Sequence, residues 1–200
     1  DVLEFAQVSD VHYTLENTAM DRYLYFLSLS LKKRNPDVII VLPHYGTQFS
    51  HDVDDYQETW NQIFLDEGAD IVLGDHAHAV EPIEIKDNIK GTKSIIVNCP
   101  GNFVNSYRAY DGDATAMVEI YIDKTTHNLI GGSIIPMWVQ ATQKSNYRAL
   151  PIYSIKNNEQ LKNEISTDDI ERVSEVYSLI TKTMIGEKIE YDNVEEKSFF

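Results

Sequence analysis

The sequence has a single cysteine among its 200 residues, and no apolar run approaches the roughly 18 residues that a membrane-spanning helix needs. Cys99 has no partner for an intrachain disulfide, so we expect a small buried apolar side chain there. No signal-peptide pattern, Gly-x-Ser-x-Gly elbow, Gly-x-Gly-x-x-Gly loop or Walker motif occurs either. These absences argue against a disulfide-stapled miniprotein, a serine hydrolase and a nucleotide-binding protein.

Basic residues are also scarce. The chain has 17 Lys and Arg against 32 Asp and Glu, which gives a formal net charge of -15. A field of that sign repels polyanions, so nucleic acid is not expected as a partner. An anionic substrate would need a local positive charge, such as a bound metal ion, to overcome the same field.

Hydrophobic periodicity predicts alternating strands and helices in the first half of the chain. The expected strands are residues 2–8, 37–42 and 71–73, and the expected helices are residues 20–31 and 54–67, the latter closed by Gly68. A strand–helix–strand order predicts parallel strands with a right-handed crossover. Residues 43–45 and 74–78 should therefore share the carboxyl edge of a sheet, where open α/β sheets bind ligands.

The pattern after residue 78 favours antiparallel β-structure. Short apolar runs at residues 82–85 and 94–97 are followed by an expected hairpin of residues 114–122 and 129–139. A polar connector then leads to a last helix, with Thr167 as its N-cap and Gly186 at its end. We expect residues 187–200 to form an acidic, mobile tail, with docking of Phe199 and Phe200 as the alternative. This order of elements predicts a layered α/β sandwich over residues 1–152, with residues 153–200 as connector, helix and tail.

Histidines mark the expected sheet edge. His76 and His78 lie on one turn after Gly74, and His44 follows the neighbouring strand. Imidazole is a common ligand of catalytic transition metals, so these three side chains predict a metal site. The alternative is that His76 and His78 only bond loop carbonyls.

A second, weaker pattern is Asp10-x-His12 at the end of the first expected strand. Carboxylate and imidazole at this spacing suit a two-metal site, but a solvated turn is an equal alternative. Asn102 could ligate metal, orient a substrate oxygen or form a simple Asx-turn. Glu84 could orient a ligand histidine or be solvated. The remaining histidines, His51 and His127, are expected to be exposed.

Several segments in order resemble the bacterial capsule-synthesis CapA (PGA_cap) family, a distant relative of calcineurin-like metallophosphoesterases. The similar segments are residues 37–46, 68–80 with Glu84, 98–103, 135–138 and 147–151. Tyr45, Asp75 and Ala77 replace residues typical of the family, whereas His44, His76 and His78 keep its presumed ligand positions. The family's upstream motifs do not occur, so the chain resembles the C-terminal half of the family domain, and we expect a fragment.

The resemblance implies a role in poly-γ-glutamate capsule synthesis or export, at an extracytoplasmic, cell-surface or membrane-associated location. The partners would be poly-γ-glutamate or another anionic polymer or phosphoester, the missing N-terminal half, or other capsule-synthesis proteins. If the chain is an enzyme, it would be a metal-dependent hydrolase of phosphoesterase type. A divalent ion or di-metal centre (Mn, Fe or Zn) would act with His44 or His76 as general acid or base, and Asp75, Asn102 and Glu84 would contact substrate. A non-catalytic assembly factor and a structural fragment are the alternatives.

Overall fold

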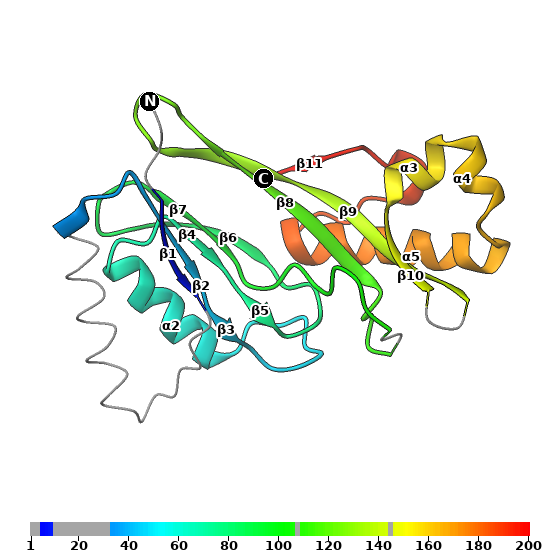
Figure 1. Cartoon of the computed structure of the whole chain (residues 1–200), viewed down its shortest axis with the longest axis horizontal. Helices are drawn as coiled ribbons and strands as arrows, with labels where there is room; N and C mark the ends of the chain where they lie inside the picture. The colour runs from blue at the N-terminus through cyan, green and yellow to red at the C-terminus, as the bar shows by residue number, and fades with distance from the viewer. Residues whose placement is uncertain (1–4, 10–32, 107–108, 144–145) are drawn as a thin grey trace.

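The computed structural model describes residues 5–9, 33–106, 109–143 and 146–200, and it confirms the expected α/β class. The chain forms four layers, helix–sheet–sheet–helix (Figure 1). The elements of the first sheet and its helix are β1 (Phe5–Ser9), β2 (Val38–Leu42), α2 (Asp55–Asp66), β4 (Ile71–Leu73), β6 (Ile83–Asp87) and β7 (Lys93–Val97). Two short strands, β3 (His44–Tyr45) and β5 (Asp75–His76), pair with each other beyond its edge.

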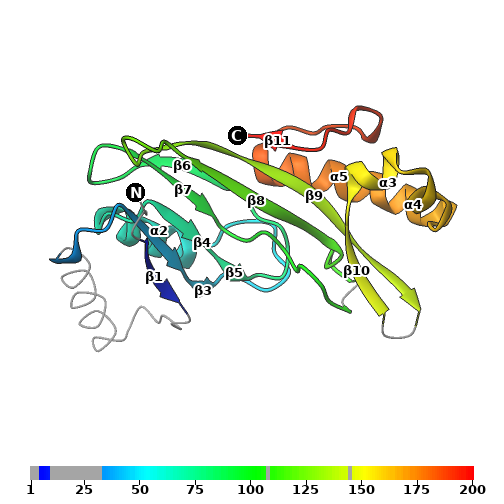
Figure 2. The ribbon, with the colours of Figure 1, turned by 45° about the horizontal axis from the view of Figure 1, so that its top comes forward.

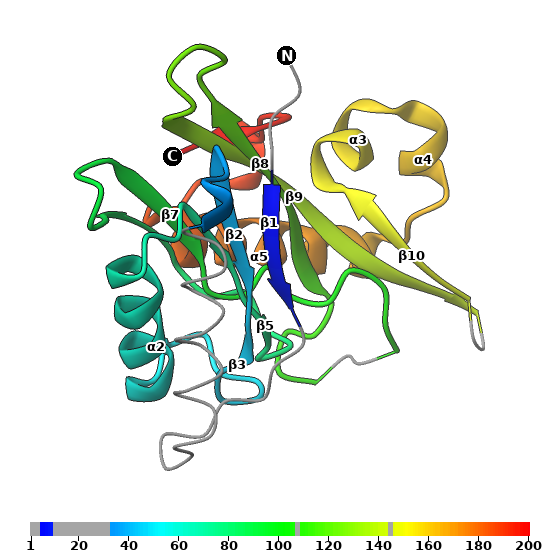
Figure 3. The same ribbon diagram turned by 60° about the vertical axis from the view of Figure 1, so that its left-hand side comes forward.

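The first sheet has the order β1-β2-β4-β7-β6, in which only β6 runs antiparallel to its neighbour. Its central strands are apolar on both faces, as the unbroken apolar run of residues 37–42 predicted. Ile39 and Val41 pack toward α2 with Trp60, whereas Val38 and Ile71 belong to the core between the two sheets. Helix α2 covers the outer face (Figure 3).

The second sheet is built on a long hairpin, β8 (Ala114–Ile122) and β9 (Leu129–Gln143), with β10 (Asn146–Pro151) and the short β11 (Ser198–Phe199) on the far side of β9. Helix α5 (Thr167–Ile185) lies against its outer face (Figure 2). The buried side chains of α5, including Val173, Tyr177 and Ile180, join the same core as the first sheet. None of the helices in the described residues is long and apolar enough to cross a membrane.

Helix ends follow the local sequence closely. Asp54 forms a capping box with Gln57 at the start of α2, and Gly68 after it has φ +89°. In α5 the N-cap is Ser166, whose hydroxyl accepts from the Asp169 backbone, so the expectation of Thr167 was wrong by one residue.

The C-terminal region is more ordered than its polar sequence suggested. The expected connector contains α3 (Ile152–Asn157) and α4 (Glu159–Asn163). The tail forms a 3-10 turn, η1 (Tyr191–Asn193), and then pairs with β9 through β11. The expectation of a mobile tail was therefore wrong, and the alternative that Phe199 and Phe200 dock is confirmed. Lys197 contributes an ion pair to Glu119 on β8. The Phe200 ring packs over Gly132, where an added Cβ would lie 2.3 Å from it.

Candidate metal-binding edge

The site lies where two parallel strands each bend and then continue. Pro43 separates β2 from β3, and Gly74 separates β4 from β5. The register of β2 on β4, Ile40 opposite Ile71, is carried across both bends, so that His44 lies opposite Asp75 and Tyr45 opposite His76. Because the offset is unchanged, the crossover geometry predicted from sequence brings residues 43–45 and 74–78 together.

Gly74 is required by this arrangement. A Cβ at this position would lie 2.1 Å from the carbonyl oxygen of Asn98 and 2.4 Å from the Tyr45 ring. Its own N–H donates to the Val97 carbonyl at 2.8 Å. The bend therefore packs main chain against main chain, which no residue with a side chain allows.

His44 and His76 form the centre of the site. His44 Nδ1 lies 2.5 Å from Asp75 Oδ1, and His44 Nε2 lies 2.8 Å from His76 Nδ1. Because the carboxylate only accepts, the Nδ1 of His44 donates to Asp75, and its Nε2 faces His76 Nδ1. The two rings meet edge-on with centroids 4.4 Å apart.

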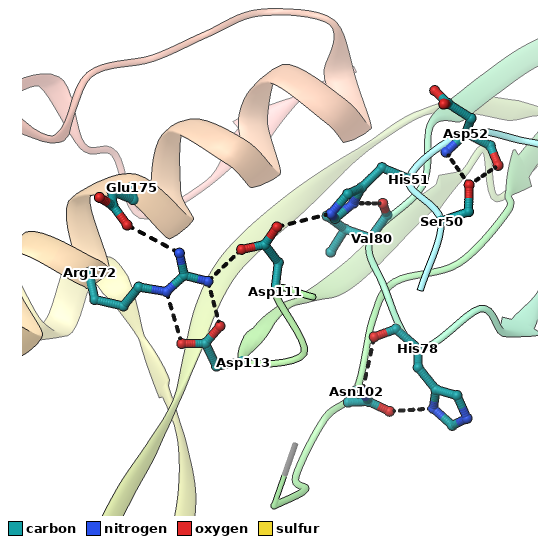
Figure 4. Close-up of polar contacts among 10 residues, drawn as sticks. All are labelled: Ser50, His51, Asp52, His78, Val80, Asn102, Asp111, Asp113, Arg172 and Glu175. Atoms are coloured by element: carbon teal, nitrogen blue, oxygen red, sulfur yellow. Dashed lines mark hydrogen bonds and ion pairs between the residues drawn. The ribbon is translucent and has the colours of Figure 1, made fainter. Parts of the chain in front are cut away.

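His78 is the third imidazole, and its ring centroid lies 6.0 Å from that of His76. Asn102 bonds both the ring and the main chain of His78 (Figure 4). The Phe49 ring stacks on His78 on one side and on Tyr110 on the other, with centroid distances of 5.8 and 5.3 Å.

Backbone strain is concentrated around these rings. Seven described residues other than glycine have positive φ, and five of them surround the site: Phe49, His76, His78, Tyr110 and Asp111. Aromatic and histidine residues adopt this conformation at a cost of about 1–3 kcal/mol each, and such strain is typical of functional sites. The neighbouring loops are tied directly, since the Phe49 N–H donates to the Ala77 carbonyl.

A buried polar chain lies beneath the histidines. The Tyr45 hydroxyl donates to Asn61 on α2, which in turn donates to Asn98 after β7. Asn98 donates to Glu84, whose other oxygen pairs with Lys86. Burial raises the pKa of Tyr45 far above its usual value, so its hydroxyl stays protonated. These hydrogen bonds link β3 to α2 and to the residue that follows β7, and so hold β3 in place against both.

Glu81 is a residue that the sequence did not single out. Its side chain is fully buried, Oε2 accepts from Gln57 Nε2 at 2.7 Å, and Oε1 has no hydrogen-bond partner among the described residues. Burial raises its pKa to about 7, although the Gln57 bond lowers it and Asp54 raises it further. Only its position three residues after His78, before Pro82, could have drawn attention to it.

His51 and His127 are half-buried and paired, so the expectation that both are exposed was wrong. His51 Nδ1 donates to the Val80 carbonyl, and its Nε2 lies 3.4 Å from Asp111 (Figure 4). His127 lies 2.8 Å from Asp37. Cys99 is buried as expected, and burial raises the pKa of its thiol to about 11.

Arg172 on α5 bonds two aspartates, Asp111 and the buried Asp113, in the segment that leads into β8 of the second sheet (Figure 4). Asp113 also accepts from Trp138 Nε1. Partial burial would raise the pKa of Asp111, but the bonds and charge of Arg172, with His51, hold it below its usual value. The strained residues Tyr110 and Asp111 are thereby held over the histidine edge.

The predicted site residues are thus partly brought together. His44, His76, His78, Asp75 and Asn102 share one edge. Glu84 lies on β6, where it pairs with Lys86 of the same strand and accepts from Asn98 just after β7. Asp10 and His12 lie outside the described residues.

The donor chemistry suits a borderline divalent ion, with imidazole nitrogens converging and a carboxylate behind one of them. Two ligands of one tetrahedral ion stand about 3.3 Å apart, so the 2.8 Å between His44 and His76 would widen slightly on binding. Across residues 5–9, 33–106, 109–143 and 146–200, no three or more His, Cys, Asp or Glu side chains are placed so that they could hold a metal ion together, the three imidazoles included. The described residues fit part of a metal site, which further donors would complete.

Comparison with known proteins finds a family to which this edge is similar. Residues 16–107, which include all three imidazoles and Asn102, match the family model described as bacterial capsule synthesis protein PGA_cap. This segment, just under half of the chain, is similar to the capsule synthesis family. The resemblance seen in the sequence is confirmed there, while the similar segments at residues 135–138 and 147–151 lie beyond the match.

Two curated relatives carry capsule names. The PGA biosynthesis protein CapA of Bacillus subtilis (strain 168) is 29% identical over 104 residues, which are 52% of this chain and 26% of that protein. The capsule biosynthesis protein CapA of Bacillus anthracis is 32% identical over 73 residues, 36% of this chain and 16% of that protein. The aligned segments thus span about a quarter or less of these capsule synthesis proteins.

Proposed function

We propose that this chain acts in the synthesis or export of a poly-γ-glutamate capsule, at the cell surface or membrane, through a divalent metal ion held by His44, His76 and His78. The observation that carries the proposal is the convergence of His44 Nε2 and His76 Nδ1 beside Asp75 at the end of two registered strands. The names of the two relatives support the biological role.

The chain's own residues would divide the work at this edge. Asp75 fixes the proton of His44 on Nδ1 and raises the basicity of its other nitrogen, as second-layer carboxylates do for metal-bound histidines. A bound Mn, Fe or Zn ion would supply positive charge and Lewis acidity. That charge matters because the chain's net charge of -15 repels an anionic polymer. Asp10 and His12 are proposed as further ligands of the same centre.

Metal titration tests the proposal directly. The protein is stripped with a chelator and titrated with Zn²⁺ and with Mn²⁺ by calorimetry, and bound metal is counted by elemental analysis. We expect stoichiometric binding, weakened at least about tenfold in His44→Ala and His76→Ala and about 10- to 100-fold in Asp75→Asn. His127→Ala is the matched control. His127 pairs with Asp37, which precedes the first residue of β2, whereas His44 follows the last, so this variant removes a histidine at the other end of the strand. A folded wild-type protein that takes up neither ion would refute the metal site.

A polymer assay separates catalysis from binding. Fluorescence polarisation of labelled poly-γ-glutamate should rise with the metal-loaded protein and not with the stripped protein or the His76→Ala variant. Shortening of the polymer over many turnovers would identify a hydrolase, whereas binding without shortening would identify an assembly factor. Equal binding with and without metal would contradict the proposed role of the ion.

A further inference from the structure

Asn102 makes two reciprocal bonds to one residue. Its Nδ2 lies 3.0 Å from the backbone carbonyl of His78, and its Oδ1 lies 2.7 Å from His78 Nδ1. A carbonyl only accepts, so the Nδ2 end of the amide must face it, which leaves Oδ1 facing the ring. An amide oxygen also only accepts, and the proton of that bond must therefore sit on His78 Nδ1.

We infer that Asn102 is a positioning residue that locks His78 in its Nδ1–H tautomer and so makes Nε2 the nitrogen available to a ligand. No described residue hydrogen-bonds that Nε2. The lock is conformational as well as chemical, because the Phe49 ring stacks on the imidazole and His78 itself has φ +58°. The inference concerns the metal-free protein. It can therefore fail while the proposed metal binding stands, and metal binding can fail while the inference stands.

The same reasoning explains why an amide is used here. An aspartate would also accept from Nδ1–H, but it could not donate to the His78 carbonyl. An alanine would leave the ring free to place its proton on Nε2, which would block the ligand-facing nitrogen. Asn102 therefore holds the ring in one orientation, with its Nδ1–H toward the amide oxygen.

Nitrogen NMR of the histidine rings tests the inference. The full chain, labelled with ¹⁵N-histidine and stripped of metal, is recorded in mildly alkaline buffer by long-range ¹H–¹⁵N correlation. His78 is assigned by loss of its signals in His78→Gln. We expect a protonated Nδ1 and a bare Nε2 in the wild type. In Asn102→Ala the ratio of the Nδ1–H to the Nε2–H form should fall about fivefold, the factor that one net hydrogen bond supports.

Two further variants sharpen the test. Asn102→Asp keeps the acceptor for Nδ1–H, so it should keep the wild-type tautomer. Asn105→Ala removes an amide of the same loop that bonds the Gly112 carbonyl, and it should leave the His78 pattern unchanged. Circular dichroism establishes that each variant is folded. An Nε2–H form in the wild type would overturn the inference even if Asn102→Ala fails to fold, and so would an unchanged tautomer ratio in a folded Asn102→Ala.

Discussion

Glu81→Gln should stabilise this protein, and more so as the pH rises. The raised pKa means that folding favours the protonated carboxyl. Well below pH 4.5 the side chain is protonated whether the chain is folded or not, so there is no penalty. Between the unfolded value of 4.5 and the folded value of about 7 the penalty grows, and above that it stays at its full size.

The size of the effect follows from the shift in pKa. Moving from 4.5 to about 7 corresponds to about 3 kcal/mol of lost stability at about pH 8 and under about 1 kcal/mol at about pH 5. Glutamine keeps the shape and the bond from Gln57 but cannot ionise. The gain in the free energy of unfolding should therefore be larger at about pH 8 than at about pH 5 by about 2.5 kcal/mol.

Urea denaturation at the two pH values measures this difference. Comparing the two gains removes any packing change that the amide introduces, since such a change is the same at both. Glu171→Gln, at an exposed position of α5, is the matched control and should show no such difference. If Glu81→Gln changes stability equally at both pH values, Glu81 does not carry a buried charge in the folded protein and the reasoning is wrong.

Two other substitutions test how the site is built. Gly74→Ala should disrupt the bend between β4 and β5, because its Cβ would meet a backbone oxygen at 2.1 Å. We expect the free energy of unfolding to fall by more than about 2 kcal/mol and metal binding to be lost. Wild-type stability and wild-type metal binding would contradict the packing described. Arg172→Ala should cost about 3–5 kcal/mol in denaturant unfolding because it leaves Asp113 buried without its cation. Arg148→Ala removes an exposed pair and should cost less than about 1 kcal/mol, so equal losses in the two variants would refute the distinction.

Local signals in the sequence determined the elements of the first sheet and its crossover. The unbroken apolar residues of β2 and β4 predicted strands buried on both faces, and Gly68 marked the end of α2 correctly. Right-handed parallel pairing then required His44 and residues 74–78 to share an edge, because chain direction fixes where the carboxyl ends of parallel strands lie. The segments that resemble the capsule family include both of these strand ends, and the family model matches residues 16–107.

Only the tertiary structure decided which partners the polar side chains bond. Asp75 bonds His44 and Asn102 bonds His78, although either residue could have faced solvent or substrate on the sequence alone. Glu81 is buried, and its carboxylate accepts from Gln57 on α2. The two residues are 24 positions apart, so no local pattern encodes this contact. The tail's pairing with β9 has the same origin. Periodicity reports which face of an element is buried, but the partner of a polar group depends on elements that meet only once the chain has folded.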